Sequence, residues 1–249
     1  MTTTPTAHIT QGSQLSKHQF VQEQILDLIE DLKVGDPIPP ERALCDRFGV
    51  SRMTLRRAVD DIVRDGQLVR RQGSGTYVAA PKLTQPLTMT SFSDEMRERG
   101  MVPSSRLLSM TQTSAGPRVA RRLQVSPAAD VIRLARLRLA DEVPMAIEVV
   151  HIPLGLVPGV TERDLQSGSL YELLAARFGL VVATGSQTIE PTVTNEDESE
   201  ALDVPLHSPA FLFRRTTRTA EGVVVESTRA IYRGDRYTIS TELAPAVGR

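Results

Sequence analysis

The sequence has very little of the chemistry that disulfides and metal sites require. Cys45 is the only cysteine among 249 residues, which excludes an internal disulfide and a cysteine-based zinc site. The four histidines are scattered without the spacing of metal ligands, so we expect no metal and no other cofactor. Cys45 lies between Leu44 and Phe48 on a short expected helix, which favours an inert packed thiol over a redox role.

Long hydrophobic runs are also missing. No stretch is long and apolar enough to span a membrane, and the first residues lack the basic and apolar regions of a signal peptide. We therefore expect a cytoplasmic protein with no membrane partner, whose residues 1–12 form a disordered tail. The length and the 40% hydrophobic content are sufficient for two domains with packed cores.

Charge is distributed unevenly, although the formal net charge is only −1. Residues 39–82 carry nine lysines and arginines against five acids, whereas residues 83–249 carry 18 against 20. Positive charge concentrated on one short segment is typical of a protein surface that binds nucleic-acid phosphates. The alternative is that these arginines only solvate a helical face, but their clustering favours phosphate binding.

The pattern of residues 13–80 indicates a helix-turn-helix that continues into a hairpin. An apolar stripe at helical spacing predicts a first helix over 14–33. A short second helix ends at Gly49, where a left-handed residue turns the chain, and Ser51 caps a third helix. Two short strands then flank a glycine-rich tip at 72–75, which predicts a wing.

The third helix has the features of a recognition helix. Its apolar residues fall on one face and leave Arg52, Thr54 and Arg56 exposed at its first turns. In a helix-turn-helix this is the end that reaches base edges, since arginine donates two hydrogen bonds to guanine.

Three motifs of this segment, Pro-Pro-Glu-Arg at 39–42, Gly-Val-Ser-Arg-Met-Thr-Leu-Arg-Arg-Ala at 49–58 and Arg-Gln-Gly-Ser-Gly-Thr-Tyr-Val at 71–78, resemble the winged helix-turn-helix of GntR-type bacterial transcription regulators. Met53 departs from the small polar residue often found at its place. The resemblance implies that the following residues contact DNA: Arg42, Ser51, Arg52, Thr54, Arg56 and Gly73.

The composition changes after the hairpin. Prolines mark a linker over 81–92, and a second domain is expected over 84–245. Helices are expected at 91–99, 118–123, 169–178 and 196–202. Strands are expected at 104–112, 131–140, 144–153 and 186–193, and a closing antiparallel meander at 209–219, 222–233 and 236–243. Strand pairs interrupted by short helices predict an α+β domain on one mostly antiparallel sheet.

Two arginines of this domain need an anionic partner. The period of two along 134–139 places Arg136 and Arg138 on one face of a strand. Helix N-termini attract phosphates and carboxylates. Thr90 and Ser91 precede one expected helix, and Ser169 begins another with Tyr171 in its first turn, so both helix N-termini can point at the arginine pair. Two alternatives stay open. Ser169 with Glu172 can form an ordinary capping box, and the arginines can pair with Glu148 or Glu226 in a surface network.

Further polar residues fit the same cavity. Glu148 stands among apolar neighbours, where a carboxylate is costly unless it accepts hydrogen bonds. Glu226 and Tyr232 share the parity of one strand, so both side chains can face one cavity, although Tyr232 can equally be a core aromatic.

Residues 84–243 are similar to the effector-binding UTRA domain of the HutC subgroup of GntR regulators, through motifs such as Arg-Leu-Arg-Leu-Ala-Asp at 136–141, Pro-Met-Ala-Ile-Glu at 144–148 and Ser-Leu-Tyr-Glu-Leu-Leu at 169–174. The resemblance implies a chorismate-lyase-like α/β fold. It also implies a phosphate site at Thr90, Ser91, Arg136, Arg138, Ser169 and Tyr171, with Glu148, Glu226 and Tyr232 lining the remainder. An amino-sugar phosphate is then the expected effector, such as N-acetylglucosamine 6-phosphate or glucosamine 6-phosphate.

These features together predict a homodimeric, ligand-responsive repressor of palindromic operator DNA, because one winged module reads too few base pairs for genomic specificity. A regulator that senses a non-sugar carboxylate is the nearest alternative. An enzyme of the lyase fold is disfavoured, since the sequence has no nucleophile and base pair, metal motif or phosphate loop. An architectural DNA protein would not need the cavity residues.

Overall fold

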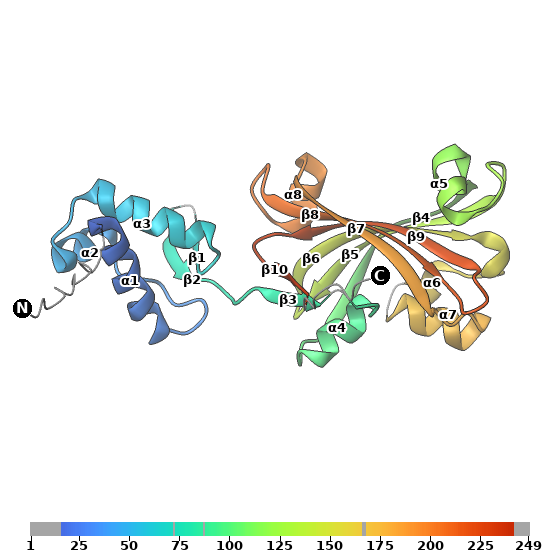
Figure 1. The fold of residues 1–249 in the computed structure, drawn as a ribbon, viewed down its shortest axis with the longest axis horizontal. Helices are drawn as coiled ribbons and strands as arrows, with labels where there is room; N and C mark the ends of the chain where they lie inside the picture. Colours follow the sequence, from blue (N-terminus) through green and yellow to red (C-terminus); the bar gives the residue numbers. More distant parts are fainter. Residues whose placement is uncertain (1–15, 72, 87, 166–167, 242–249) are drawn as a thin grey trace, which may run out of the picture. The chain divides into compact units, whose positions relative to one another are not determined.

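The computed structural model describes residues 16–71, 73–86, 88–165 and 168–241 (Figure 1). The chain divides into two compact units, and the division falls between Pro81 and Lys82. No helix of the described residues is long and apolar enough to cross a membrane.

The first unit contains three helices and a hairpin: α1 (Lys17–Glu30), α2 (Glu41–Phe48), α3 (Arg52–Arg64), β1 (Leu68–Arg71) and β2 (Gly75–Val78). Local signals set their ends. Gly49 adopts a left-handed φ of 63° after α2, and the Ser51 hydroxyl accepts a hydrogen bond from the Thr54 backbone N–H to cap α3. Strands β1 and β2 pair antiparallel, with Arg71 opposite Gly75.

The core of the first unit is one apolar cluster. It joins Ile25 of α1, Leu44 of α2, Leu55 and Ile62 of α3, and Leu68 of β1, all of them at most 2% exposed. The expected stripes therefore face one another, which leaves the polar start of α3 in solvent.

The second unit is built on a six-stranded antiparallel sheet with the order β4-β5-β6-β9-β8-β7. The strands of this sheet are β4 (Pro103–Ser114), β5 (Asp130–Ala140), β6 (Val143–Pro153), β7 (Thr184–Val193), β8 (Pro209–Arg218) and β9 (Val224–Arg233). Asp141 and Glu142 form the two-residue β5–β6 turn, both with positive φ, as this tight turn requires. The structure confirms the expected α+β fold with a mostly antiparallel sheet.

Short helices cover both faces of this sheet (Figure 1). They are α4 (Phe92–Glu98), α5 (Gly116–Leu123), η1 (Leu154–Leu156), α6 (Glu162–Leu165), α7 (Leu170–Phe178) and α8 (Glu196–Leu202). Helices α4, α6 and α7 pack on one face, where Met96 and Leu174 are fully buried. Helices α5 and α8 pack on the other face, through Leu123 and Leu202. The alternation of each strand supplies apolar side chains to both layers.

The last strand does not close the expected meander. Strand β10 (Tyr237–Ser240) instead pairs in parallel with β3 (Leu83–Pro86), which lies in the segment expected to be a linker. Gly234 lies close to β8 at the end of β9, where its backbone N–H donates to the Pro209 carbonyl at 2.9 Å and a Cβ would lie 2.7 Å from the same oxygen. The chain thus leaves β9 at Gly234, and Tyr237 packs edge-on against Tyr232 with ring centroids 4.8 Å apart. Residues 242 and 243 of the expected strand lie outside the described residues.

Candidate functional site

A polar cavity lies between the sheet of the second unit and helices α4 and α7. Its free volume is about 40 Å³. The residues that line it are Thr90, Ser91, Phe92, Glu95, Arg136, Arg138, Glu148, Leu170, Tyr171, Gln187, Phe213, Arg215, Glu226, Thr228, Ala230 and Tyr232. Eight of the nine residues that the sequence predicts for effector binding are among them, and Ser169 is the exception.

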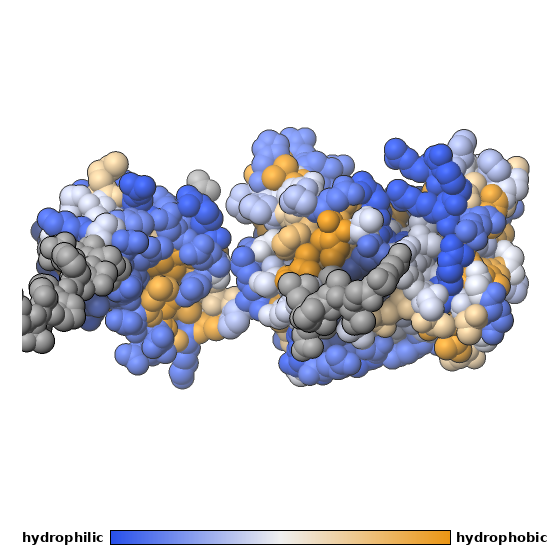
Figure 2. Space-filling view, viewed as in Figure 1, coloured by the Kyte–Doolittle hydropathy of each residue, from blue (hydrophilic) through white to orange (hydrophobic). Residues whose placement is uncertain are grey.

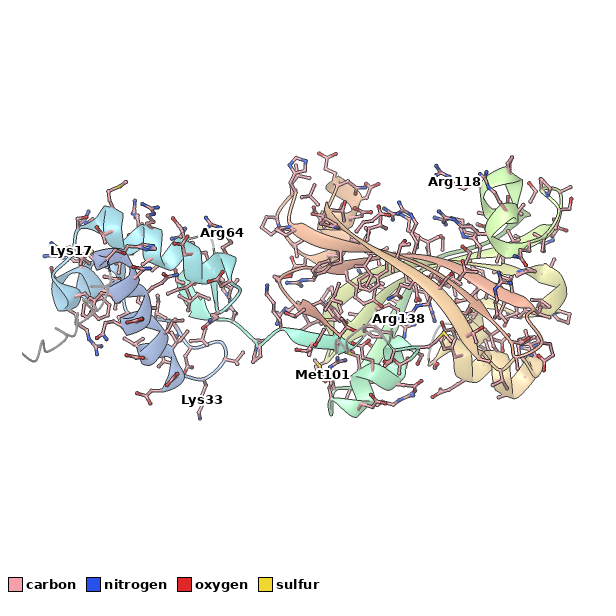
Figure 3. The ribbon with its side chains drawn as sticks, viewed as in Figure 1. Lys17, Lys33, Arg64, Met101, Arg118 and Arg138 are labelled. Atoms are coloured by element: carbon pink, nitrogen blue, oxygen red, sulfur yellow. The ribbon has the colours of Figure 1, made fainter. Side chains whose placement is uncertain are left out.

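Two neighbouring arginines of β5 form the basic side of the cavity. Arg136 and Arg138 are each only 2% exposed, and Figure 3 shows Arg138 on the α4 side of the sheet. The Arg136 Nη2 donates to Glu148 Oε2 at 2.6 Å, and the Arg138 Nη2 donates to Ser93 Oγ at 2.9 Å. Arg138 also stacks over the Phe92 ring, 4.6 Å from its centroid. The surface-network interpretation is therefore wrong in its location, although Arg136 does pair with Glu148.

Each of these arginines keeps an unused donor. The Nε atoms of Arg136 and Arg138 are buried and have no hydrogen-bond partner among the described residues. Burial and the charge of Arg136 lower the pKa of Arg138 to about 10. Two neighbouring cations buried away from water are costly without further negative charge, so the arrangement favours an added anion.

Two glutamates on adjacent strands, Glu148 of β6 and Glu226 of β9, line the same cavity, and their pKa values shift in opposite directions. Burial raises the pKa of Glu148, but Arg136 and Arg138 outweigh it and hold the pKa below its usual value. Burial and the nearby Glu148 raise the pKa of Glu226. Glu226 accepts hydrogen bonds from the Tyr171 hydroxyl at 2.9 Å and from the Thr228 hydroxyl at 3.0 Å.

Two serines cap the helices that border the cavity. Ser91 Oγ accepts from the Asp94 backbone N–H at 3.1 Å, at the start of α4, and also lines the cavity. Ser169 Oγ accepts from the Glu172 backbone N–H at 3.3 Å, at the start of α7. Ser169 is buried but does not line the cavity, so the capping interpretation describes its position and the phosphate-site role stays a prediction.

The sequence analysis missed two charged residues that line the cavity. Arg215 of β8 donates to Gln187 Oε1 at 2.7 Å and to the Thr90 carbonyl at 3.2 Å. Arg215 is two residues from Phe213 on the same strand, so both side chains point to the same face of the sheet. A charged residue at this position of an otherwise apolar face could have indicated a cavity residue. Glu95 of α4 is 4% exposed and is hydrogen-bonded by Arg99 Nη1, while Arg99 Nη2 donates to the Thr84 carbonyl of β3.

Tyr232 is both a cavity residue and a core aromatic. It is 7% exposed, lines the cavity beside Arg138, and packs against Phe213 with centroids 4.7 Å apart. Burial raises the pKa of its hydroxyl, so it stays a neutral hydrogen-bond donor near neutral pH. Both interpretations of this residue therefore apply.

In the first unit, the residues predicted to contact DNA lie on three separate elements. Arg42 is exposed in the first turn of α2, and Gly73 is exposed in the turn between β1 and β2. The other four lie at the N-terminal end of α3: Ser51, Arg52, Thr54 and Arg56. Arg52 is exposed and forms no ion pair with any described residue. Arg56 forms a 2.8 Å ion pair with Glu41, which holds its guanidinium between α2 and α3.

Ser51 and Thr54 have a clear local role. Ser51 Oγ lies 3.0 Å from Thr54 Oγ1 and caps the helix, so these hydroxyls hold the start of α3. Met53, which lies between Arg52 and Thr54 in the sequence, is 78% exposed. An exposed apolar side chain at this turn is suited to contact a thymine methyl group.

Both units match known families. A family model described as "Bacterial regulatory proteins, gntR family" matches residues 17–78, and one described as "UTRA domain" matches residues 98–238. The chain is 34% identical to the HTH-type transcriptional repressor NagR of Bacillus subtilis, over 93% of this chain and 96% of the relative. It is 30% identical to the mannosyl-D-glycerate transport/metabolism system repressor MngR of Escherichia coli, over 88% of this chain and 94% of the relative.

A solved structure matches nearly the whole chain. The crystal structure of PhnF from Mycobacterium smegmatis aligns with a TM-score of 0.65 and 30% identity, over 90% of this chain and 99% of that chain. These relatives are named as transcriptional repressors or regulators, not as enzymes.

Proposed function

This chain belongs to the GntR family of bacterial regulatory proteins and is a transcriptional repressor with a UTRA domain, and from that premise we propose a specific mode of control. The protein binds palindromic operator DNA as a homodimer. A small anionic metabolite occupies the cavity of the second unit and changes the affinity of the first unit for that DNA.

The observation that carries this proposal is the pair of unused Nε donors on Arg136 and Arg138. A buried donor without an acceptor costs about 1–3 kcal/mol, and more when the group is charged. A phosphate or carboxylate accepts hydrogen bonds from guanidinium groups with favourable geometry. An anion in the cavity would therefore satisfy both arginines at once.

The remaining cavity residues favour a polyhydroxylated anion. Glu148, Glu226 and Gln187 offer acceptors, while Tyr171 and Tyr232 offer hydroxyls, a combination suited to the hydroxyls of a sugar. A phosphorylated amino sugar, such as N-acetylglucosamine 6-phosphate or glucosamine 6-phosphate, has both the anion and the hydroxyls. The name of the relative MngR, which refers to mannosyl-D-glycerate, is consistent with a sugar-containing anion.

The size of the cavity implies that binding rearranges it. A free volume of about 40 Å³ holds one or two water molecules, not a hexose phosphate. Side chains around the arginines must move to admit the ligand, and the Arg136–Glu148 pair is one contact that can change as they do. Such a change of contacts is what a ligand needs in order to shift a protein between two states.

The first unit supplies the DNA contacts. Arg52 at the start of α3 is free to donate to guanine in the major groove, and Arg42 and Gly73 lie on elements that reach the phosphates. Two such units in a twofold dimer read two half-sites, which gives a palindromic operator its specificity.

Calorimetry on the intact protein tests the proposal. N-acetylglucosamine 6-phosphate should bind, while N-acetylglucosamine and inorganic phosphate should bind at least tenfold more weakly, because each offers only half of the contacts. Arg136→Ala should abolish the binding heat, whereas the matched control Arg133→Ala, on the opposite face of the same strand, should retain it. Binding of a simple dicarboxylate in place of the sugar phosphate would favour the non-sugar alternative.

Operator DNA binding provides the second measurement. The ligand that binds should change DNA affinity by roughly 5- to 150-fold, the usual range of allosteric coupling. DNA affinity that is indifferent to every anion in a metabolite panel would overturn ligand control.

A further inference from the structure

A second and larger space, the β7 compartment, adjoins the polar cavity. Its walls include Met89, Gly185, Gln187, Ile189 and Arg215, and its free volume is about 470 Å³. Gln187 and Arg215 also line the polar cavity, so the two spaces are neighbouring parts of one site. Volumes of roughly 300–1,000 Å³ are typical of small-molecule sites. Most of the room for a ligand therefore lies at β7 and not beside the buried arginines.

The sheet register shows how far this compartment lies from the arginines. One row across five neighbouring strands contains Arg136, Glu148, Ala230, Phe213 and Ile189. Strands lie about 4.8 Å apart, so four spacings place β7 about 19 Å from β5 along the sheet. A hexose phosphate measures roughly 10 Å from ordinary bond lengths. With its anion at the arginines it ends near the middle of the row, so only a further substituent reaches the β7 compartment.

The wall of the compartment is mostly uncharged. Gly185 carries no side chain, and Met89 and Ile189 are apolar. Arg215 is the only charged residue among the described residues of this wall, and its guanidinium stays protonated. In Figure 2, apolar and polar surface meet on the face of the second unit where Figure 1 shows β7. Such a wall suits an uncharged group with an apolar end, and it repels an ammonium group.

Gly185 and Met89 together set the size of the compartment. A Cβ at Gly185 would lie 2.8 Å from the Met89 Sδ and 3.1 Å from the Thr216 carbonyl oxygen. Both distances are shorter than ordinary van der Waals contact, so an alanine at this position would displace Met89. Because both residues line the compartment, the missing side chain of Gly185 preserves its free space.

We infer that the β7 compartment holds the acyl group of an N-acylated amino-sugar phosphate. This inference rests on the proposed function and narrows its effector to the acylated form. Gln187 Oε1 accepts a hydrogen bond from Arg215 at 2.7 Å, and the Gln187 NH₂ group makes none with the described residues. That NH₂ group can donate to the acyl carbonyl, while the acyl chain covers Met89 and Ile189. A free ammonium in the same place would meet the charge of Arg215 instead.

An acyl series measured by calorimetry on the full chain tests the inference. N-acetylglucosamine 6-phosphate should bind at least about tenfold more tightly than glucosamine 6-phosphate, because the ammonium is repelled and the acetyl group is not. N-butanoylglucosamine 6-phosphate should bind roughly tenfold more tightly again, since each buried methylene group strengthens binding about fourfold. Affinity that stays equal or falls along this series would overturn the inference.

Two substitutions locate the acyl group. Gly185→Ala should reduce the advantage of the butanoyl ligand over the acetyl ligand to less than about twofold, because Met89 is pushed into the space. Thr184→Ala is the matched control, since Thr184 is exposed on β7 with its side chain on the opposite face, and it should keep the parental series. Met89→Ala should bind N-hexanoylglucosamine 6-phosphate more tightly than the parent does, a gain that requires folded protein. Parental affinities in both Gly185→Ala and Met89→Ala would overturn this placement.

The outcomes separate this inference from the proposed function. If none of the phosphorylated amino sugars binds, the effector chemistry of the proposed function fails, and the acyl site fails with it. If all of them bind with one affinity and Arg136→Ala abolishes that binding, the proposed function stands and only the acyl site is overturned.

Discussion

Arg136 and Glu148 stand directly opposite each other on β5 and β6, and the Arg136 Nη2 donates to Glu148 Oε2 at 2.6 Å. This cross-strand pair closes the cavity at its basic side. An anion that accepts from the unused Nε of Arg136 would share this guanidinium with Glu148, so the pair stabilises the cavity and should also influence how tightly an anion binds.

Arg136→Ala should abolish effector binding and leave effector-free operator affinity within about twofold. It leaves Glu148 with only Arg138, whose Nη1 lies 3.7 Å away, so we expect a loss of stability of about 3 kcal/mol. Calorimetry measures the binding and urea unfolding measures the stability. Unchanged effector affinity in a folded variant would remove Arg136 from the site, and R136A/E148Q should recover part of the stability without binding.

Arg52→Ala should weaken specific operator binding by about 1–3 kcal/mol without changing effector affinity, because Arg52 is exposed and makes no hydrogen bond or ion pair with the described residues. Arg64→Ala, at the far end of α3 where Arg64 pairs with Asp61, is the matched control. Fluorescence anisotropy with operator and scrambled DNA measures both. Equal operator affinity for Arg52→Ala and the parent would show that Arg52 does not read bases.

Glu226→Gln should stabilise the protein at neutral pH but not near pH 4. Burial and the nearby Glu148 raise the pKa of Glu226 above the usual 4.5 in the folded state. The folded protein therefore binds the proton of the Glu226 carboxyl more tightly than the unfolded protein does. The contribution of Glu226 to stability is therefore present below pH 4.5 and is lost as the pH rises through the folded pKa. Thermal unfolding should show the Tm of the variant exceeding that of the parent increasingly from pH 4 to 8. A constant Tm difference across this range contradicts the shift.

Arg99→Ala should weaken the coupling between effector and DNA more than it weakens either binding alone. Arg99 links Glu95, which lines the cavity, to the Thr84 carbonyl of β3, and β3 follows the first unit directly in the chain. We expect the effector-induced change in operator affinity to fall about tenfold, within the range of single-residue coupling effects. Glu98→Ala, exposed on the same helix, is the control. Full coupling in Arg99→Ala would exclude this link.

Local sequence signals predicted the elements of the second unit well. Helix α8 spans the expected residues 196–202, and the hairpin turn at Asp141 and Glu142 lies where it was expected. These features depend on caps, turn residues and periodicity within a few positions of the chain. The same local parity placed Arg136 and Arg138 on one face of β5.

Contacts between distant segments were harder to predict. Arg215 lies 125 residues from Thr90, to which it donates a hydrogen bond, and no local pattern links the two. Strand β10 was assigned to the meander because it follows β9, but it pairs in parallel with β3, which lies more than 150 residues earlier in the chain. In both cases the decisive partner is remote in sequence.

The amino-acid sequence alone is enough to predict the two-unit organisation, the winged helix-turn-helix motifs and the alternation that places two arginines on one side of β5. Those properties follow from short-range sterics, capping and hydrophobic periodicity, which act within a few residues. The packed fold was needed to show that Arg136 pairs with Glu148, that Arg215 and Glu95 line the cavity, and that α5 and α8 share one face of the sheet. Burial and electrostatic pairing act through space, so these outcomes depend on which strands and helices the packed core brings together.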